Sequence, residues 1–251
     1  MENEVQIRNR VEELSQSGYE IDLGKYISSS WKTVSADFFG YGLLCFVQVL
    51  VTLLAACTIV GLVCVPALSV GFMYIAHKVK KGEPYTTGDL FLGFKNFGNI
   101  FTYSLIYGGL ILLFMIPFIA GEGLFIYGSS ENESSLMISG GVLLALGIPL
   151  MLVGIYYFQT SFFFSHYLIL FGNYSATEAI RASRKLASKN FWYVLLFLFV
   201  SALLGNIGVY ACYIGMFVSI PFMLFMQHDM IYDLLETDTS TDDKISKHLV
   251  S

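Results

Sequence analysis

The fold is decided by residues 38–76, which read FFGYGLLCFVQVLVTLLAACTIVGLVCVPALSVGFMYIA and contain no Asp, Glu, Lys or Arg. Three further stretches share this property, at residues 96–121, 134–177 and 190–228. A helix rises about 1.5 Å per residue and the hydrocarbon layer of a bilayer is roughly 30 Å thick, so about 20 residues make one crossing. The two runs of 39 residues are therefore long enough for two helices each, and the run of 26 residues for one.

The composition supports a membrane protein. The chain has 251 residues, of which 55% are hydrophobic and 13% charged, with a mean hydropathy of +0.65. A soluble domain of this composition would expose large apolar patches to water. The runs lack the strict alternation of membrane strands, and the net charge of -5 provides no basic surface for nucleic acid. We therefore expect an all-α fold, a polytopic membrane helix bundle without a nucleic-acid partner.

Six crossings, arranged as three hairpins, place every loop without Lys or Arg on one side of the membrane. These loops lie near Gly61, at residues 121–135 and at residues 205–210, and all 14 basic residues then lie on the other side. Because basic residues beside span ends stay in the cytoplasm, both termini are expected to be cytoplasmic. The run 134–177 leaves an alternative open, since a seventh crossing there would put the basic cluster at residues 181–189 outside.

The chain is accordingly divided into three parts. Residues 1–37 form a cytoplasmic segment, in which Ile7, Val11 and Leu14 have the spacing of a short helix. Residues 237–251 form a flexible cytoplasmic tail of polar composition. The transmembrane domain covers residues 38–236, with spans expected near 38–59, 62–79, 97–120, 136–160, 190–209 and 211–234.

Prolines and small residues predict how these spans pack. A proline leaves the carbonyl four residues earlier without its helical hydrogen bond, so kinked helices around a shared interior are expected. The prolines in question are Pro66, Pro117, Pro149 and Pro221. Small residues four apart let helices approach closely. Such pairs are Ser104 with Gly108, Ser201 with Gly205, and Ala211 with Gly215.

Two cytoplasmic segments begin with the pattern of a capping box, Thr86 with Asp89 and Ser175 with Glu178. The second pattern predicts a helix at residues 176–188 with a basic face. Its basic residues are Arg181, Arg184, Lys185 and Lys189. They are candidate contacts for the phosphate headgroups of lipids, and ordinary positive-inside charge is an equally good explanation.

Polar side chains inside apolar runs are the first candidates for a binding cavity in a membrane protein. Here they are Gln48, Gln159, Thr160, His166, Asn206 and Gln227. No ionised residue lies in the middle of a span, which argues against an ion-coupled pump. His77, His166 and His228 lie 11, 17 and 7 residues from the nearest preceding span proline, so a repeated plan does not predict a shared metal site.

The sequence lacks the familiar catalytic patterns. It contains no zinc-protease motif, no serine on a glycine-flanked elbow and no phosphate-binding Gly-Lys loop. We therefore expect no enzymatic activity, no cofactor and no metal. The leading hypothesis is a scaffold or accessory subunit that contacts membrane lipids, a membrane-protein partner or a second copy of the chain. The alternative is a transporter or lipid-handling protein with a cavity between kinked helices.

Three segments together resemble a large bacterial family of six-helix integral membrane proteins. They are residues 66–71 (PALSVG), residues 175–179 (SATEA) with Ser183, and the closing run from Gly215 through Pro221 to Tyr232. The family includes the membrane domain of membrane-anchored glycerophosphoryl diester phosphodiesterases and stand-alone relatives of unknown function. The resemblance covers residues 23–236 and implies a multi-pass protein of the bacterial inner membrane. It transfers no catalytic residue, because the chemistry of those phosphodiesterases belongs to a separate soluble domain.

Overall fold

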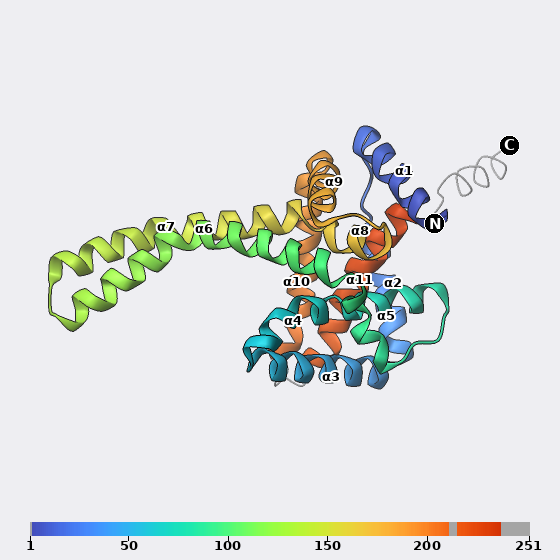
Figure 1. Ribbon diagram of the computed structural model, residues 1–251, viewed down its shortest axis with the longest axis horizontal. Coiled ribbons are helices and arrows are strands. Elements are labelled where there is room, and N and C mark those ends of the chain that lie inside the picture. Colours follow the sequence, from blue (N-terminus) through green and yellow to red (C-terminus); the bar gives the residue numbers. More distant parts are fainter. Residues whose placement is uncertain (1, 211–214, 237–251) are drawn as a thin grey trace.

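The computed structural model describes residues 2–210 and 215–236, and every regular element in these residues is helical (Figure 1). The prediction of an all-α membrane helix bundle is confirmed. The elements are α1 (Glu2–Ser17), α2 (Leu23–Ala36), α3 (Phe38–Ala56), α4 (Ile59–Ser69), α5 (Gly71–Lys81), the 3-10 helix η1 (Thr87–Asn96), α6 (Phe97–Ser130), α7 (Ser134–Ser161), α8 (Ser165–Phe171), α9 (Ala176–Lys189), α10 (Phe191–Tyr210) and α11 (Met216–Leu235). The predicted tail at residues 237–251 lies outside the described residues.

The N-terminal segment consists of two helices that pack on the remainder of the chain. Ile7, Val11 and Leu14 are buried on one face of α1, as their spacing predicts. Helix α2 begins where the Asp22 side chain accepts a hydrogen bond from the backbone nitrogen of Lys25, at 3.0 Å. It then packs along α11, a contact that the sequence did not indicate.

Within residues 2–210 and 215–236, five helical stretches are long and apolar enough to cross a membrane: Phe38–Ala56, Ile59–Lys81, Thr87–Ser130, Ser134–Phe171 and Phe191–Val209. Six spans were expected, and α11 is not among these five. Its second half carries Gln227, His228, Asp229 and Asp233, which lower its hydropathy. The first residues of the expected sixth span, 211–214, lie outside the described part of the chain.

Helix α11 nevertheless runs back along α10. Gln227 lies beside Ser201, with Nε2 and Oγ 3.1 Å apart, and the Ser219 hydroxyl donates to the Gly205 carbonyl at 2.6 Å. Increasing residue numbers on one helix therefore meet decreasing numbers on the other. The two helices form an antiparallel hairpin, so the end of α11 returns to the side on which α10 begins.

The run of residues 134–177 holds one candidate span. Helix α7 continues to Ser161, and a short turn leads into α8, which ends at Phe171. By length and composition, the stretch Ser134–Phe171 is one candidate span, and its last part is the short buried helix α8.

The second span is interrupted between α4 and α5 at Val70, four residues after Pro66. The amide of Gln48 on α3 donates to the Leu68 carbonyl at 3.0 Å. A polar side chain thereby satisfies a backbone carbonyl at the break, as an apolar environment requires. Pro117, Pro149 and Pro221 lie inside helices that continue through them.

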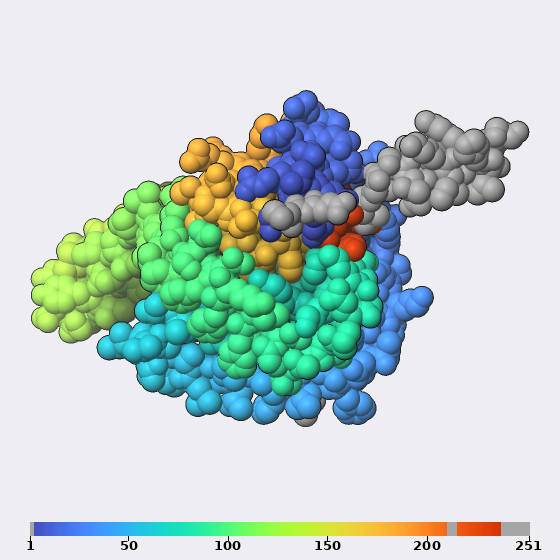
Figure 2. All heavy atoms as spheres, turned by 45° about the vertical axis from the view of Figure 1, so that its right-hand side comes forward, coloured from blue at the N-terminus to red at the C-terminus, as the bar shows by residue number. Residues whose placement is uncertain are grey.

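Helices α6 and α7 form a hairpin that projects from the other helices (Figures 1 and 2). At about 1.5 Å per residue, the 34 residues of α6 measure about 51 Å, more than the hydrocarbon layer of roughly 30 Å. The expected loop at residues 121–135 is therefore wrong for most of its length. Only a short turn connects the helices, with Asn132 in the left-handed region (φ 55°).

A glycine seam explains why the two helices stay together to the tip. Its members recur every seven residues, about two helical turns, and so lie on one face of each helix. They are Gly121 and Gly128 on α6, and Gly140, Gly147 and Gly154 on α7. A Cβ atom at Gly128 would lie 2.7 Å from the backbone nitrogen of Met137, and one at Gly140 would lie 2.5 Å from that of Phe125. At Gly121, Gly128, Gly140 and Gly147 the two backbones touch, whereas Gly154 faces the side chain of Phe114.

The small-residue pairs expected from the sequence have different outcomes. Gly205 faces Met223 of α11, with a built Cβ 2.8 Å from its sulfur, so the close approach at Ser201 and Gly205 is confirmed. The same prediction is wrong for Gly108, whose added Cβ would meet nothing within 4 Å. Ala211 lies outside the described residues.

Candidate functional site

Helix α9 presents its basic face outward and packs its opposite face on the protein. Ser175 begins it as predicted, because the backbone nitrogen and the hydroxyl of Ser175 both donate to Glu178 Oε2, at 3.0 and 2.8 Å. These two bonds stabilise the carboxylate and hold the pKa of Glu178 below its usual value. The capping box at Thr86 is also present, but it opens the 3-10 helix η1.

The buried face of α9 is fixed by Ser183. Its hydroxyl donates to the Ser161 carbonyl at 2.9 Å and accepts from the backbone nitrogen of Phe164 at 3.0 Å. Ser161 is the last residue of α7, and Phe164 directly precedes α8. This contact orients α9, so that its four cations Arg181, Arg184, Lys185 and Lys189 are all exposed. Within residues 2–210 and 215–236, none of them forms an ion pair.

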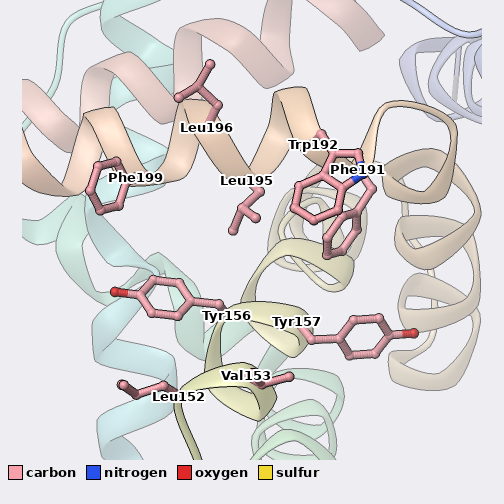
Figure 3. Close-up of a pocket in the computed structure, with 9 residues that line it drawn as sticks. All are labelled: Leu152, Val153, Tyr156, Tyr157, Phe191, Trp192, Leu195, Leu196 and Phe199. Atoms are coloured by element: carbon pink, nitrogen blue, oxygen red, sulfur yellow. The ribbon is translucent and has the colours of Figure 1, made fainter. Parts of the chain in front are cut away.

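An apolar groove lies between α7 and α10, with a volume of about 640 Å³ (Figure 3). Its lining residues are Leu152, Val153, Tyr156 and Tyr157 of α7, and Phe191, Trp192, Leu195, Leu196 and Phe199 of α10. Most of them are exposed, including Trp192 at 77%. In a membrane this groove faces the acyl chains.

The groove and the cations of α9 are neighbours along the chain. Lys189 ends α9, and Phe191 begins α10 two residues later. Phe191 and Trp192 form one end of the groove (Figure 3), and the Phe191 ring lies 5.8 Å from that of Tyr157. The apolar groove thus ends two residues along the chain from Lys189, a cation without an ion pair in the described residues. This combination suits the two ends of an anionic phospholipid.

A second, polar cavity of about 320 Å³ lies among α4, α5, α6, α7, α8, α10 and α11, and is here called the interhelical cavity. Three of the six polar residues singled out in the sequence line it: Gln159, His166 and Gln227. Its remaining lining residues are Ser69, Met73, Tyr103, Ser104, Tyr107, Phe162, Phe163, Leu198 and Ile231. The structure therefore brings together polar groups that are far apart in the sequence.

The other three candidate polar residues bond to backbone carbonyls and lie outside this lining. Gln48 donates to Leu68, as described, and the Thr160 hydroxyl donates to Tyr156 at 2.7 Å. The Asn206 amide donates to Ala202 at 2.8 Å. Each of these side chains therefore bonds to a backbone carbonyl, and none of the three lines the cavity.

Asp229 and Asp233 of α11, and Glu236 directly after it, anchor the neighbouring helices through contacts that the sequence did not indicate. Asp229 accepts from the Ser29 hydroxyl at 2.6 Å and pairs with Lys80 at 3.2 Å. Their spacing of four and three residues, which places them on one helix face, was the available signal. The remaining pairs join Asp233 with Lys25 at 2.6 Å, and Glu236 with Lys81 at 3.2 Å and with the Tyr167 hydroxyl at 2.7 Å.

The three histidines near the span ends, His77, His166 and His228, lie at two different sites in the structure. His77 Nδ1 and His228 Nε2 are 3.4 Å apart beside Glu236, whereas His166 packs its ring against Tyr103 at 4.5 Å. In the part of the chain that the structure describes, no group of three His, Cys, Asp or Glu side chains has the geometry of a metal site. The pair of His77 and His228 thus forms part of the packing of α5 against α8 and α11.

The resemblance of residues 23–236 to the six-helix family stays a prediction. It depends on short motifs such as residues 66–71, whose role in the structure is the break between α4 and α5. Comparison of the chain with protein-family models, with curated proteins and with solved structures found no match.

Proposed function

We propose that the chain is a non-enzymatic integral membrane protein that holds an anionic phospholipid and serves as a scaffold or accessory subunit. The observation that carries the proposal is the apolar groove whose end at Phe191 follows Lys189 by two residues, with Lys185 one helical turn earlier on α9. An acyl chain occupies the groove, and the phosphate lies at the ammonium groups. The aromatic rings of Trp192, Tyr156 and Tyr157 suit the boundary between acyl chains and headgroups.

The proposal includes an orientation in the bacterial inner membrane. With both termini in the cytoplasm, α9 meets the cytoplasmic leaflet, which carries the anionic headgroups. The antiparallel pairing of α10 with α11 supports this arrangement, because it brings the acidic end of α11 to the side of Lys189. A protein partner or a second copy of the chain would bind the same lipid-facing surface.

Labelling tests the orientation. A single cysteine is placed at Arg184 in a chain whose own four cysteines are replaced, and intact cells are treated with a membrane-impermeant thiol reagent. We expect labelling only after the cells are permeabilised. Labelling of this exposed position in intact cells would contradict the proposed orientation and place α9 outside the cytoplasm.

Lipid retention tests the site itself. The purified chain is exchanged into detergent with equal amounts of phosphatidylglycerol and phosphatidylcholine, and the retained lipid is counted by native mass spectrometry. Each lysine near an anionic headgroup contributes about 1 kcal/mol, so Lys185→Gln with Lys189→Gln removes about 2 kcal/mol, roughly a 30-fold loss of preference. Equal retention of the two lipids by the unaltered chain would contradict the proposal.

A matched control separates the groove from general surface charge. Lys95 is also exposed and without an ion pair in the described residues, but it lies on η1, away from the groove. Lys95→Gln should leave the preference unchanged. Leu196→Trp, which fills the groove, should reduce retention of both lipids while the cations stay in place.

A second candidate function, transport or lipid handling, is favoured by the interhelical cavity. Its lining combines three of the polar residues expected for such a cavity, Gln159, His166 and Gln227. The groove and this cavity share no lining residue, so the two candidates can be tested separately.

A further inference from the structure

Several polar groups that line the interhelical cavity have no hydrogen-bond partner among the described residues. The hydroxyls of Tyr103 and Tyr107, the amide of Gln159 and the imidazole of His166 make no hydrogen bond with any part of residues 2–210 and 215–236. Gln227 uses only its amide nitrogen, which donates to Ser201 at 3.1 Å. The cavity is open on one side, because Gln159 and Ser69 are exposed, so water or a ligand can enter it and bind these groups.

The size and walls of the cavity limit the ligand. Its volume of about 320 Å³ is at the small end of the roughly 300–1,000 Å³ range of small-molecule sites. Tyr103, Tyr107 and Phe162 form an aromatic wall, with Phe162 edge-on to the two tyrosines at centroid distances of 6.5 and 6.3 Å. An aromatic wall favours a ligand with an apolar face.

The absence of charged residues in the lining disfavours a charged ligand. No Asp, Glu, Lys or Arg is among the twelve lining residues, in contrast to the cationic end of the groove. A charged ligand would lose its hydration here without gaining a counter-charge. Amide, imidazole and phenol groups instead supply both donors and acceptors.

We propose that the interhelical cavity binds a small, uncharged molecule that has hydrogen-bond donors and acceptors and one apolar face. Gln159 and His166 bind its polar groups, and the aromatic wall packs on its apolar face. The inference is independent of the lipid groove, because neither site contributes a residue to the other.

Saturation-transfer NMR on the full chain in lipid nanodiscs tests this proposal with matched probes. The probes are nicotinamide with nicotinate, and glucose with gluconate, so each neutral molecule has an anionic counterpart of similar size. We expect saturation transfer to at least one neutral probe and to neither anion. Gln159→Leu should weaken binding of that probe about fivefold, the effect of one lost hydrogen bond.

Two further variants keep the test decisive. Tyr107→Phe removes one hydroxyl at constant shape and should weaken binding without lowering the melting temperature. Asn206→Leu removes an intramembrane amide outside the cavity and should leave binding unchanged. Transfer to neither neutral probe, which would mean a cavity filled with water, would overturn the proposal. Equal binding of the anions, or equal losses in Asn206→Leu and Gln159→Leu, would overturn it as well.

Discussion

The glycine seam makes a quantitative prediction about two adjacent residues of α7. Gly140→Ala and Gly141→Ala both replace a helical glycine, so each gains up to about 1 kcal/mol in helix propensity. At Gly140 the new methyl group would lie 2.5 Å from the backbone nitrogen of Phe125 and 2.8 Å from the Gly121 carbonyl oxygen. At Gly141 it would meet nothing within 4 Å. The comparison isolates the cost of separating two backbones.

Overpacking of this kind costs typically 1–3 kcal/mol, about the difference we expect between the two variants. For a chain of this length 1 kcal/mol shifts the melting temperature by about 2–4 °C, so Gly140→Ala should melt about 2–12 °C below Gly141→Ala. The measurement is thermal unfolding in one detergent, followed by tryptophan fluorescence. Limited proteolysis of the hairpin provides an independent check, because separated helices expose the backbone at Gly121 and Gly140, which is buried in the intact hairpin.

The result that would refute the reasoning is equal melting temperatures for the two alanine variants. Gly147→Ala guards against an effect peculiar to one position, since its Cβ would lie 2.8 Å from the backbone nitrogen of Phe118. It should resemble Gly140→Ala. The two sites are about 10 Å apart along the helix, so their effects should add.

Two further predictions concern charged groups at the helix ends. Lys80→Met leaves the Asp229 carboxylate, whose side chain is 4% exposed, without its cation, and should lower the free energy of unfolding by about 3–5 kcal/mol. Lys25→Met breaks the more exposed pair with Asp233 and should lower the free energy of unfolding by at most about 1 kcal/mol. Equal losses of the two variants in chemical unfolding would disprove this ranking. Because the pKa of Glu178 is lowered in the folded chain, its stabilising effect is complete above the ordinary value of 4.5 and is lost as the pH falls through the lowered pKa. The protection factors of the α9 amides, which are corrected for the intrinsic pH dependence of exchange, should therefore fall in acid, and Glu178→Gln should remove that fall.

The acids of α11 also bear on how the protein is assembled. Asp229, Asp233 and Glu236 each bind a lysine from an earlier helix, so α2 and α5 are held at one end of α11. Tyr26 of α2 donates to Asp233 at 3.0 Å, and burial beside this carboxylate raises the pKa of Tyr26. The polar end of α11 thus joins the N-terminal helices to the membrane-spanning ones.

Local features of the chain were predictable because each depends on residues close in sequence. The positions of the helices follow from the apolar runs, because the length of each run can be compared directly with the thickness of the hydrocarbon layer. Ser175 and Glu178 begin α9 as predicted because a capping box is complete within four residues. Ile7, Val11 and Leu14 indicate the buried face of α1 through their spacing.

Contacts between helices were predictable only in part. The expected loop at residues 121–135 was wrong because a charge at Glu122 suggested the end of a span, whereas Gly121 and Gly128 let α6 follow α7 to Ser130. The period of seven was present in the sequence but does not say which helix it faces. Gly108, equally small, faces no helix.

The sequence by itself determined a helical membrane protein with polar side chains inside its spans, because hydrophobic length and helical hydrogen bonding are properties of one segment. Only the tertiary structure decided which polar groups meet. Gln159 and His166 line the interhelical cavity, whereas Thr160, adjacent to Gln159, bonds to its own helix at Tyr156. The physical reason is that neighbouring residues on a helix point about 100° apart, so the packing of the other helices selects which of them faces the interior.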